Sequence, residues 1–190
     1  MNAAEYLVLE SLRDGRPVRI RALRPSDRDA MLASVDRLGE ASVYRRFFAP
    51  RHGFTERELA YYLEVDFSSH VALVAELDED GQAVIAGGGR YVVSEPGCAE
   101  LAFAVDDPHH GLGIGTLLMR HLVSIARAAH LDTLKAEVLA DNAPMLGVFK
   151  SCGLPLRQTR EGGVAHVRMD CRNGSATKGE DDRSPPLGAH

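Results

Sequence analysis

A run of glycines between a strand pattern and a helix pattern is the stretch of this sequence with the clearest chemical meaning. Gly111, Gly113 and Gly115 alternate with other residues after the apolar segment 98–105. A glycine-rich turn that opens a helix directs several backbone N–H groups to one point, where the helix dipole also favours negative charge. The run therefore predicts a binding site for an anionic group such as phosphate.

Two common phosphate-binding motifs do not fit this spacing. The dinucleotide fingerprint G-x-G-x-x-G fails because Thr116 stands where its third glycine belongs. The P-loop fails because no Gly-Lys-Ser or Gly-Lys-Thr follows the run. The anionic ligand is therefore expected to be held by a different kind of turn.

Glu100 is the acidic side chain of the strand segment 98–105, "CAELAFAV", which leads into the glycine run. Strand alternation places it on the same face as Ala102 and Ala104. A carboxylate in reach of a bound anionic ligand can remove a proton from an incoming nucleophile. Glu100 is therefore a candidate general base, and a merely solvated carboxylate on an edge strand is the alternative that the residues alone leave open.

The elements that must position these groups begin with a strand over 17–24. A helix with Ser26 as N-cap follows, and a second helix begins at the capping box of Thr55 and Glu58 and ends near Val65. Three segments rich in β-forming residues then predict an antiparallel meander, with strands over 70–77, 82–93 and 98–105.

The second half of the chain predicts an amphipathic helix over 114–129, a strand over 131–140 and a helix over 143–152. Two final strands, over about 155–160 and 164–169, flank a hairpin turn at Gly162 and Gly163. A strand, helix and strand within 98–139 should place its two strands parallel. The sequence thus predicts an α/β fold with a mixed, mostly antiparallel sheet, a central parallel strand pair and flanking helices.

With these features in place, the chain resembles the GNAT superfamily of N-acetyltransferases from about Val18 to Met169. The pyrophosphate-binding turn of that superfamily reads Gln or Arg, two residues, Gly, one residue, then Gly or Ala; here His110, Gly113 and Gly115 hold those places. The order of elements is also similar. The chain is most similar to the bacterial protein-lysine acetyltransferase domains, on the segments 42–48 and 139–146, Asp66, and "AE" at 99–100.

The resemblance implies an acyltransferase that moves acetyl from acetyl-CoA directly to a primary amine, most simply a protein lysine, with Glu100 as general base. Acetyl-CoA is then the co-substrate, and no metal is expected. A protein acceptor would need an open, acidic or polar groove, which Arg45, Arg46, Phe47 and Phe48 could help to shape. The residues that the resemblance assigns to acetyl-CoA are Phe103, Ala104, Val105, His110, Gly111, Leu112, Gly113, Ile114, Gly115, Thr116, Asn142 and Phe149.

Three departures from the family pattern leave alternatives open. His110 replaces Gln or Arg, Leu154 replaces an aromatic residue, and Phe149 stands where many members carry a tyrosine general acid. An acetyltransferase for small-molecule amines and a non-catalytic acyl-CoA-binding sensor are therefore also considered. A covalent route through Cys98 is a further alternative, although its sequence neighbours include no His or Lys and a core position is favoured.

Composition limits the other function classes. The chain has 190 residues, 45% of them hydrophobic, and a net charge of −5 without a long basic block, which argues against nucleic acid or membrane as a partner. We expect a soluble, cytoplasmic protein with one domain over 17–171, an extension over 1–16 and a disordered tail over 172–190. The oligomeric state stays open, with a homodimer as one alternative.

Overall fold

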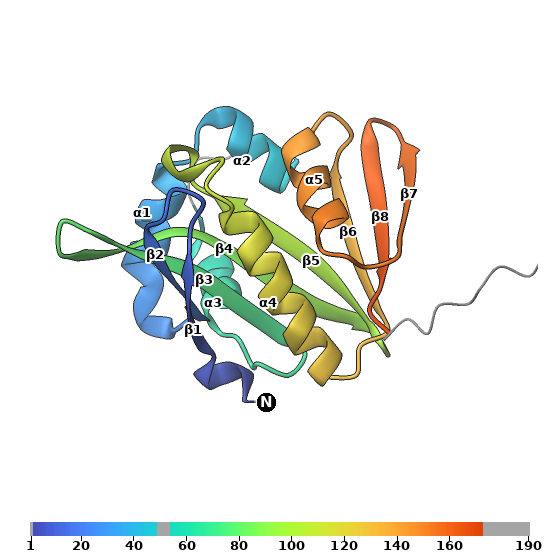
Figure 1. Cartoon of the computed structure of the whole chain (residues 1–190), viewed down its shortest axis with the longest axis horizontal. Helices are drawn as coiled ribbons and strands as arrows, with labels where there is room; N and C mark the ends of the chain where they lie inside the picture. The colour runs from blue at the N-terminus through green and yellow to red at the C-terminus, as the bar shows by residue number, and fades with distance from the viewer. Residues whose placement is uncertain (1, 49–53, 173–190) are drawn as a thin grey trace, which may run out of the picture.

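The computed structural model describes residues 2–48 and 54–172, which form one mixed eight-stranded sheet in the order β1-β2-β3-β4-β5-β6-β8-β7 (Figure 1). Neighbouring strands are antiparallel except for β5 and β6, which are parallel. This confirms the predicted fold class. The strands are β1 (Leu7–Ser11), β2 (Pro17–Ala22), β3 (His70–Glu79), β4 (Gln82–Glu95), β5 (Cys98–Val105), β6 (Thr133–Leu139), β7 (Leu156–Glu161) and β8 (Val164–Asp170).

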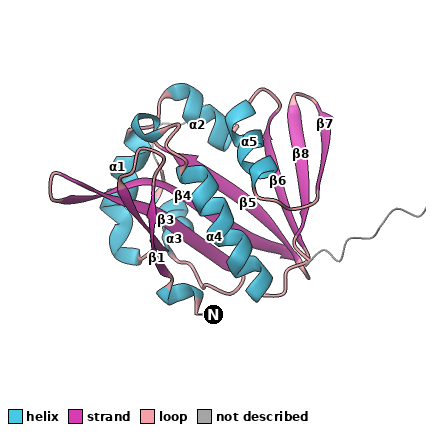
Figure 2. Cartoon of the chain, in the orientation of Figure 1, coloured by secondary structure: helices cyan, strands magenta, loops and turns pink. Residues whose placement is uncertain are grey.

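Helices cover both faces of this sheet (Figure 2). On one face α4 crosses β3, β4 and β5 and packs beside α5, whereas α1 packs on β4 from the other face and α2 contacts β5 and β6. The helices are α1 (Arg28–Asp36), α2 (Glu40–Phe47), α3 (Glu56–Leu63), α4 (Ile114–Ala128) and α5 (Ala143–Ser151), with 3-10 turns η1 (Ala3–Glu5), η2 (Pro25–Asp27) and η3 (Asp107–His109). In the described part of the chain, no helix is long and apolar enough to cross a membrane.

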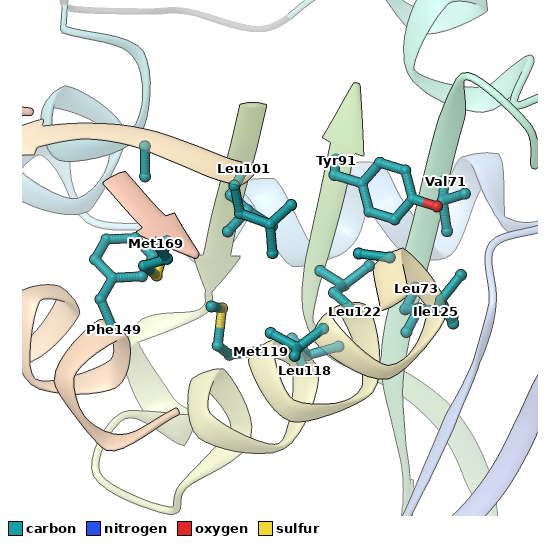
Figure 3. Close-up of a cluster of buried hydrophobic side chains, with 14 of the residues drawn as sticks. Val71, Leu73, Tyr91, Leu101, Leu118, Met119, Leu122, Ile125, Phe149 and Met169 are labelled. Atoms are coloured by element: carbon teal, nitrogen blue, oxygen red, sulfur yellow. The ribbon is translucent and has the colours of Figure 1, made fainter. Parts of the chain in front are cut away.

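The main core lies between α4, α5 and the sheet (Figure 3). Leu118 and Leu122 of α4 are fully buried and pack toward Leu73 and Tyr91, while Phe149 of α5 closes the other end of the cluster. Burial raises the pKa of Tyr91 to about 12. Full burial of a large apolar side chain contributes about 1.5–3 kcal/mol, so this layer fixes α4, and with it the turn at the start of α4, on the sheet.

The N-terminal segment is not a simple extension, because β1 pairs with β2 from Leu7–Arg21 to Ser11–Pro17. Glu10 of β1 also holds α4: its carboxylate accepts from Arg120 at 2.5 Å and lies 3.0 Å from His121 Nε2. The hydroxyl of Tyr6 lies 2.6 Å from His121 Nδ1. Strand β1 was not predicted from the sequence.

The helices before β3 differ from the prediction in two places. The first helix begins at Arg28, after a 3-10 turn, with Asp27 rather than Ser26 at its N-cap, and a separate helix, α2, occupies Glu40–Phe47. Gly39 separates the two helices and its N–H donates to Asp107. The capping box of Thr55 and Glu58 is confirmed at the start of α3. The predicted disordered tail lies outside the described residues from 173 onward.

Asp66 fixes the entry to β3. Its carboxylate accepts from the backbone N–H groups of Ser68, Ser69 and His70 at 2.8–2.9 Å and from the Ser69 hydroxyl at 2.6 Å. Partial burial tends to raise the pKa of Asp66, but these hydrogen bonds outweigh it and hold the pKa well below its usual range. Asp66 is thus explained as a loop-ordering residue.

Candidate active site

The site begins where the central parallel strands separate. The ladder between β5 and β6 joins three residue pairs and ends at Glu100–Lys135. From Leu101 to Val105, β5 remains paired with β4, but no described strand pairs with its other edge. Apart from the carbonyl of Val105, which His110 contacts, the backbone groups on that edge have no described strand partner and can bind a ligand. They border a cleft of about 1300 Å³.

The cleft brings together most of the residues proposed from the sequence. Apart from Leu112, all of them line it: Glu100, Phe103, Ala104, Val105, His110, Gly111, Gly113, Ile114, Gly115, Thr116, Asn142 and Phe149. Leu112 does not line the cleft, but its backbone helps to hold the turn in place: its carbonyl accepts a hydrogen bond from the N–H of Arg13 at 3.1 Å. The assignment of each residue to a ligand remains a prediction.

The glycine turn has a backbone that requires glycine at its key position. Gly113 is the N-cap of α4 and has φ = 91°, in the left-handed region that side chains disfavour. A Cβ at Gly113 would also lie 3.3 Å from the side chain of Arg13. The turn therefore leaves the first N–H groups of α4 facing the cleft, as an anion site needs.

Arg13 is a cleft residue that sequence reasoning missed. It stands in the turn between β1 and β2, its guanidinium donates to Gly111 O at 3.3 Å, and its side chain is exposed. Arg13 and Gly111 are 98 positions apart in the chain, so no local spacing could reveal the contact. Its charge adds to the positive potential at the glycine turn.

A buried polar network holds the segment that leads into the glycine turn. Asp106 is fully buried and accepts from Arg37 Nε at 2.6 Å, and its other carboxylate oxygen lies 2.5 Å from His109 Nδ1. The second ring nitrogen of His109 lies 2.7 Å from Glu79 Oε1. The network joins α1, the β3–β4 hairpin and the end of β5, and it encloses His109, which is 5% exposed.

His110 turns back toward the strand. Its Nε2 lies 2.8 Å from Val105 O, so the imidazole covers the carbonyl at the end of β5. The side chain is otherwise exposed at the rim of the cleft. In residues 2–48 and 54–172, no group of three or more His, Cys, Asp or Glu is arranged to hold a metal.

Aromatic packing shapes the cleft floor. Phe103 and Phe149 meet edge to face, with ring centroids 6.1 Å apart. The ring of Phe103 lies against Gly89 of β4, where an added Cβ would come within 2.8 Å of it. Phe149 is 1% exposed and has no acidic proton to donate. Asn142 caps α5, because its side chain accepts from Met145 N at 3.2 Å.

Glu100 occupies the point where β5 and β6 separate. Its side chain is exposed within the cleft, so a molecule bound in the cleft can reach it. Cys98, on the same face, is buried and does not line the cleft, although Lys135 does lie beside it. The geometry therefore gives no support to a covalent route through Cys98.

The side of the cleft away from the glycine turn, where the resemblance places the acceptor, lies between α2 and the strands β6, β8 and β7. Arg45, Arg46 and Phe48 line it from the helix side. The expected groove was acidic or polar, and the observed one is polar with an excess of cationic side chains. Six Lys or Arg residues line the whole cleft against two carboxylates, those of Glu100 and Glu137.

Fold and cleft together define a protein that can hold an extended ligand along the free edge of β5, bind its anionic end at the start of α4, and expose a carboxylate to a second substrate. The profile of the Acetyltransferase (GNAT) family matches residues 41–154. The chain belongs to this family.

Individual relatives agree with this assignment. The chain is 37% identical over 120 residues to "Acetyltransferase PA5475" of Pseudomonas aeruginosa, covering 63% of this chain and 64% of that protein. It is 30% identical over 144 residues to "Acetyltransferase Pat" of Mycolicibacterium smegmatis, covering 75% of this chain but 42% of Pat. The chain thus spans less than two thirds of the length of either relative.

A solved structure matches over nearly its full length. The GNAT domain of S. lividans PAT superposes with a TM-score of 0.79 at 28% identity, over 86% of this chain and 96% of that domain. The match confirms the predicted resemblance to Pat-type domains.

Proposed function

We propose that this chain is an N-acetyltransferase that moves acetyl from acetyl-CoA directly to the side-chain amine of a protein lysine, with Glu100 as general base. The observation that carries the proposal is the position of Glu100, which forms the last pair of the β5–β6 ladder and stands exposed where the strands separate. Family membership and the similarity to Pat and PAT domains support the acceptor class.

The cleft fits acetyl-CoA at both ends. The free edge of β5 at Phe103, Ala104 and Val105 offers backbone groups to the amides of a pantetheine arm and a donor to a thioester carbonyl. The glycine turn, from His110 to Thr116, offers helix N–H groups to the pyrophosphate. Acetyl-CoA supplies the activated acyl group, and the chain supplies its orientation.

Proton transfer is the step that needs a side chain. At pH 7 a lysine amine with pKa near 10.4 is neutral in about one of a few thousand molecules. Glu100 takes the proton, directly or through a water, and the neutral amine then forms its bond to the thioester carbon. The C–S bond breaks, and the nitrogen, which carries one proton too many after the attack, passes that proton to the thiolate directly or through a water. Because the thiol pKa is about 8.5, the products are the amide and the CoA thiol without a tyrosine at position 149.

Two other functions predict different substrates. A small-amine acetyltransferase would need a closed acceptor pocket, whereas the acceptor side here opens onto exposed strands at Arg157 and Arg168. An acyl-CoA sensor would bind without turnover, and the inert ring of Phe149 is the feature that favours it.

Labelled acetyl-CoA and a deacetylated bacterial lysate test the proposal. We expect label on discrete lysines in mass spectrometry with the wild-type chain and its loss with Glu100→Gln. Turnover with free amino acids or polyamines, but not with proteins, would assign a small-amine enzyme instead. Tight binding of acetyl-CoA without any acetyl transfer would indicate a non-catalytic acyl-CoA sensor instead.

Arg13 gives a separate prediction about the donor site. Arg13→Ala should raise KM for acetyl-CoA about three- to tenfold and leave kcat nearly unchanged, because an exposed cation near a phosphate contributes about 1 kcal/mol. Arg16→Ala is the matched control, since Arg16 lies in the same turn but pairs with Asp14 at 2.8 Å. Steady-state kinetics measure both, and equal KM values for Arg13→Ala and wild type would contradict the assignment.

A further inference from the structure

Three cationic side chains form one row across the exposed face of the sheet, starting beside the proposed base. Glu100 of β5 is opposite Lys135 of β6, Lys135 is opposite Arg168 of β8, and Arg168 is opposite Arg157 of β7. All four side chains line the cleft. The row therefore leads from Glu100 outward over three strands.

The two outer members of this row, Arg168 and Arg157, are not held in ion pairs by any described residue, although Arg168 lies close enough to Glu95 and Asp170 to lower the pKa of both carboxyls. Both are exposed, and within the described residues neither forms an ion pair with a carboxylate. Arg168 makes one hydrogen bond, to Thr133 Oγ1 at 3.3 Å, while Lys135 is paired with Glu95. Like charges directly opposite each other on a sheet are destabilising, so the fold itself gains nothing from placing these two arginines side by side.

The opposite wall of the cleft has the same sign of charge. Arg45 of α2 is exposed and lines the cleft, and among the described residues it has no ion-pair partner. In contrast, the whole chain carries a net charge of −5. Positive charge is thus concentrated in this cleft against the balance of the molecule, which indicates an anionic partner.

We propose that the row Lys135–Arg168–Arg157 is a docking surface for acidic residues that flank the acceptor lysine of a protein substrate. The proposal rests on the proposed function, because it assumes a peptide acceptor with its lysine at Glu100. The proposal is based on charge complementarity, because a carboxylate can accept two parallel hydrogen bonds from the planar guanidinium group of an exposed arginine.

The spacing of the strands sets the position of those acidic residues. Adjacent strands lie about 4.8 Å apart, so Arg168 and Arg157 stand roughly 10 and 14 Å from the strand of Glu100. An extended peptide advances about 3.4 Å per residue. The preferred carboxylates should therefore lie about three or four residues from the acceptor lysine.

Three peptides that differ only at those flanking positions test the proposal. They carry one central lysine flanked by Asp and Glu, by Ser and Gln, or by Arg. With the wild-type chain we expect kcat/KM for the acidic peptide to exceed that for the neutral one by about three- to tenfold at low salt, and the arginine peptide to be the poorest. Added salt should reduce the differences.

Two sets of variants locate the effect. Arg157→Gln with Arg168→Gln should remove the preference, and Arg157→Glu with Arg168→Glu should reverse it. Arg160→Gln is the matched control, because Arg160 is exposed on β7 but points to the other face of the sheet and does not line the cleft. KM for acetyl-CoA should stay the same in all of these variants.

Binding of fluorescent peptides to the CoA-loaded chain separates this proposal from the function on which it rests. Acidic-peptide binding that depends on Arg157 and Arg168 supports the docking surface, whether or not the lysine is acetylated. Acetylation without any charge preference, or a preference that survives Arg157→Gln with Arg168→Gln, overturns it while leaving the lysine acetyltransferase intact. A raised KM for acetyl-CoA in that variant also overturns it, because the row would then serve the donor.

Discussion

Glu100→Gln should lower kcat/KM for acetyl transfer by about 10²–10⁴-fold, the usual contribution of a positioned general base. The substitution keeps the size of the side chain and removes its ability to accept the amine proton. Because Glu100 is exposed in the cleft, the variant should fold with the same thermal stability and bind acetyl-CoA as well as the wild type.

The residual rate of this variant gives a second readout that a structural role would not produce. Without a base, the rate follows the fraction of neutral lysine, which rises about tenfold per pH unit below the lysine pKa of about 10.4. Glu100→Gln should therefore show a steep rise between about pH 7 and pH 9, and the wild type a shallower one. Glu161→Gln, at the exposed β7–β8 turn, serves as control; wild-type activity in Glu100→Gln would remove Glu100 from the mechanism.

The elements that depend on residues close together in the sequence were predicted correctly. The meander β3–β5, helix α4, the Thr55 cap and the glycine hairpin at Gly162 all follow from periodicity, turn residues or caps within a few positions. Helix α2 was missed because its segment "EASVYRRF" is short and follows Gly39, which has no side chain to cap it, so that its contacts with β5 and β6 determine its place.

Most of the residues that line the cleft were named from the sequence, but their surroundings were not, and their roles stay predictions. The glycine turn lies within one continuous segment, so its spacing pointed to it, and the resemblance to the GNAT superfamily singled out Glu100 on the strand before it. The contact of Arg13 with the turn, the enclosure of His109 and the cationic row depend on strands that are distant in sequence. Register decides which side chains become neighbours in a sheet, and a single sequence does not state the order of the strands.

The substitution with the largest expected effect on stability is at Arg21, a buried residue of β2. Arg21 is 6% exposed and forms a bidentate pair with Asp27 at 2.7 and 2.9 Å, and its Nε donates to Glu76 at 2.7 Å. Burial lowers the pKa of Arg21, but the hydrogen bonds to the two carboxylates outweigh it and raise the pKa. The guanidinium thus joins β2 to β3 and to the start of α1.

Arg21→Met should lower the free energy of unfolding by about 3–5 kcal/mol, because it leaves Asp27 buried without its counter-ion. Urea unfolding followed by circular dichroism measures the change. Arg19→Met is the matched control: Arg19 pairs with the same Glu76 at 2.8 Å but is 45% exposed, so its loss should cost less than about 1 kcal/mol.

A double variant tests the physical reason. Asp27→Leu added to Arg21→Met removes the uncompensated charge and should recover part of the lost stability. If Arg21→Met is no more destabilising than Arg19→Met, the buried pair does not hold α1 on the sheet.

With the proposed donor site beside it, the short β5–β6 ladder would also couple the lifetime of the folded chain to the supply of acyl donor. Three residue pairs join the strands β1–β5 to the strands β6–β8, so a ligand that fills the gap binds the folded state and finds no such site in the unfolded one. A ligand at one hundred times its Kd stabilises the folded state by about 2.7 kcal/mol. Cells rich in acyl donor would then keep more of the protein folded and resistant to proteolysis, and its abundance would follow the same metabolite that it consumes.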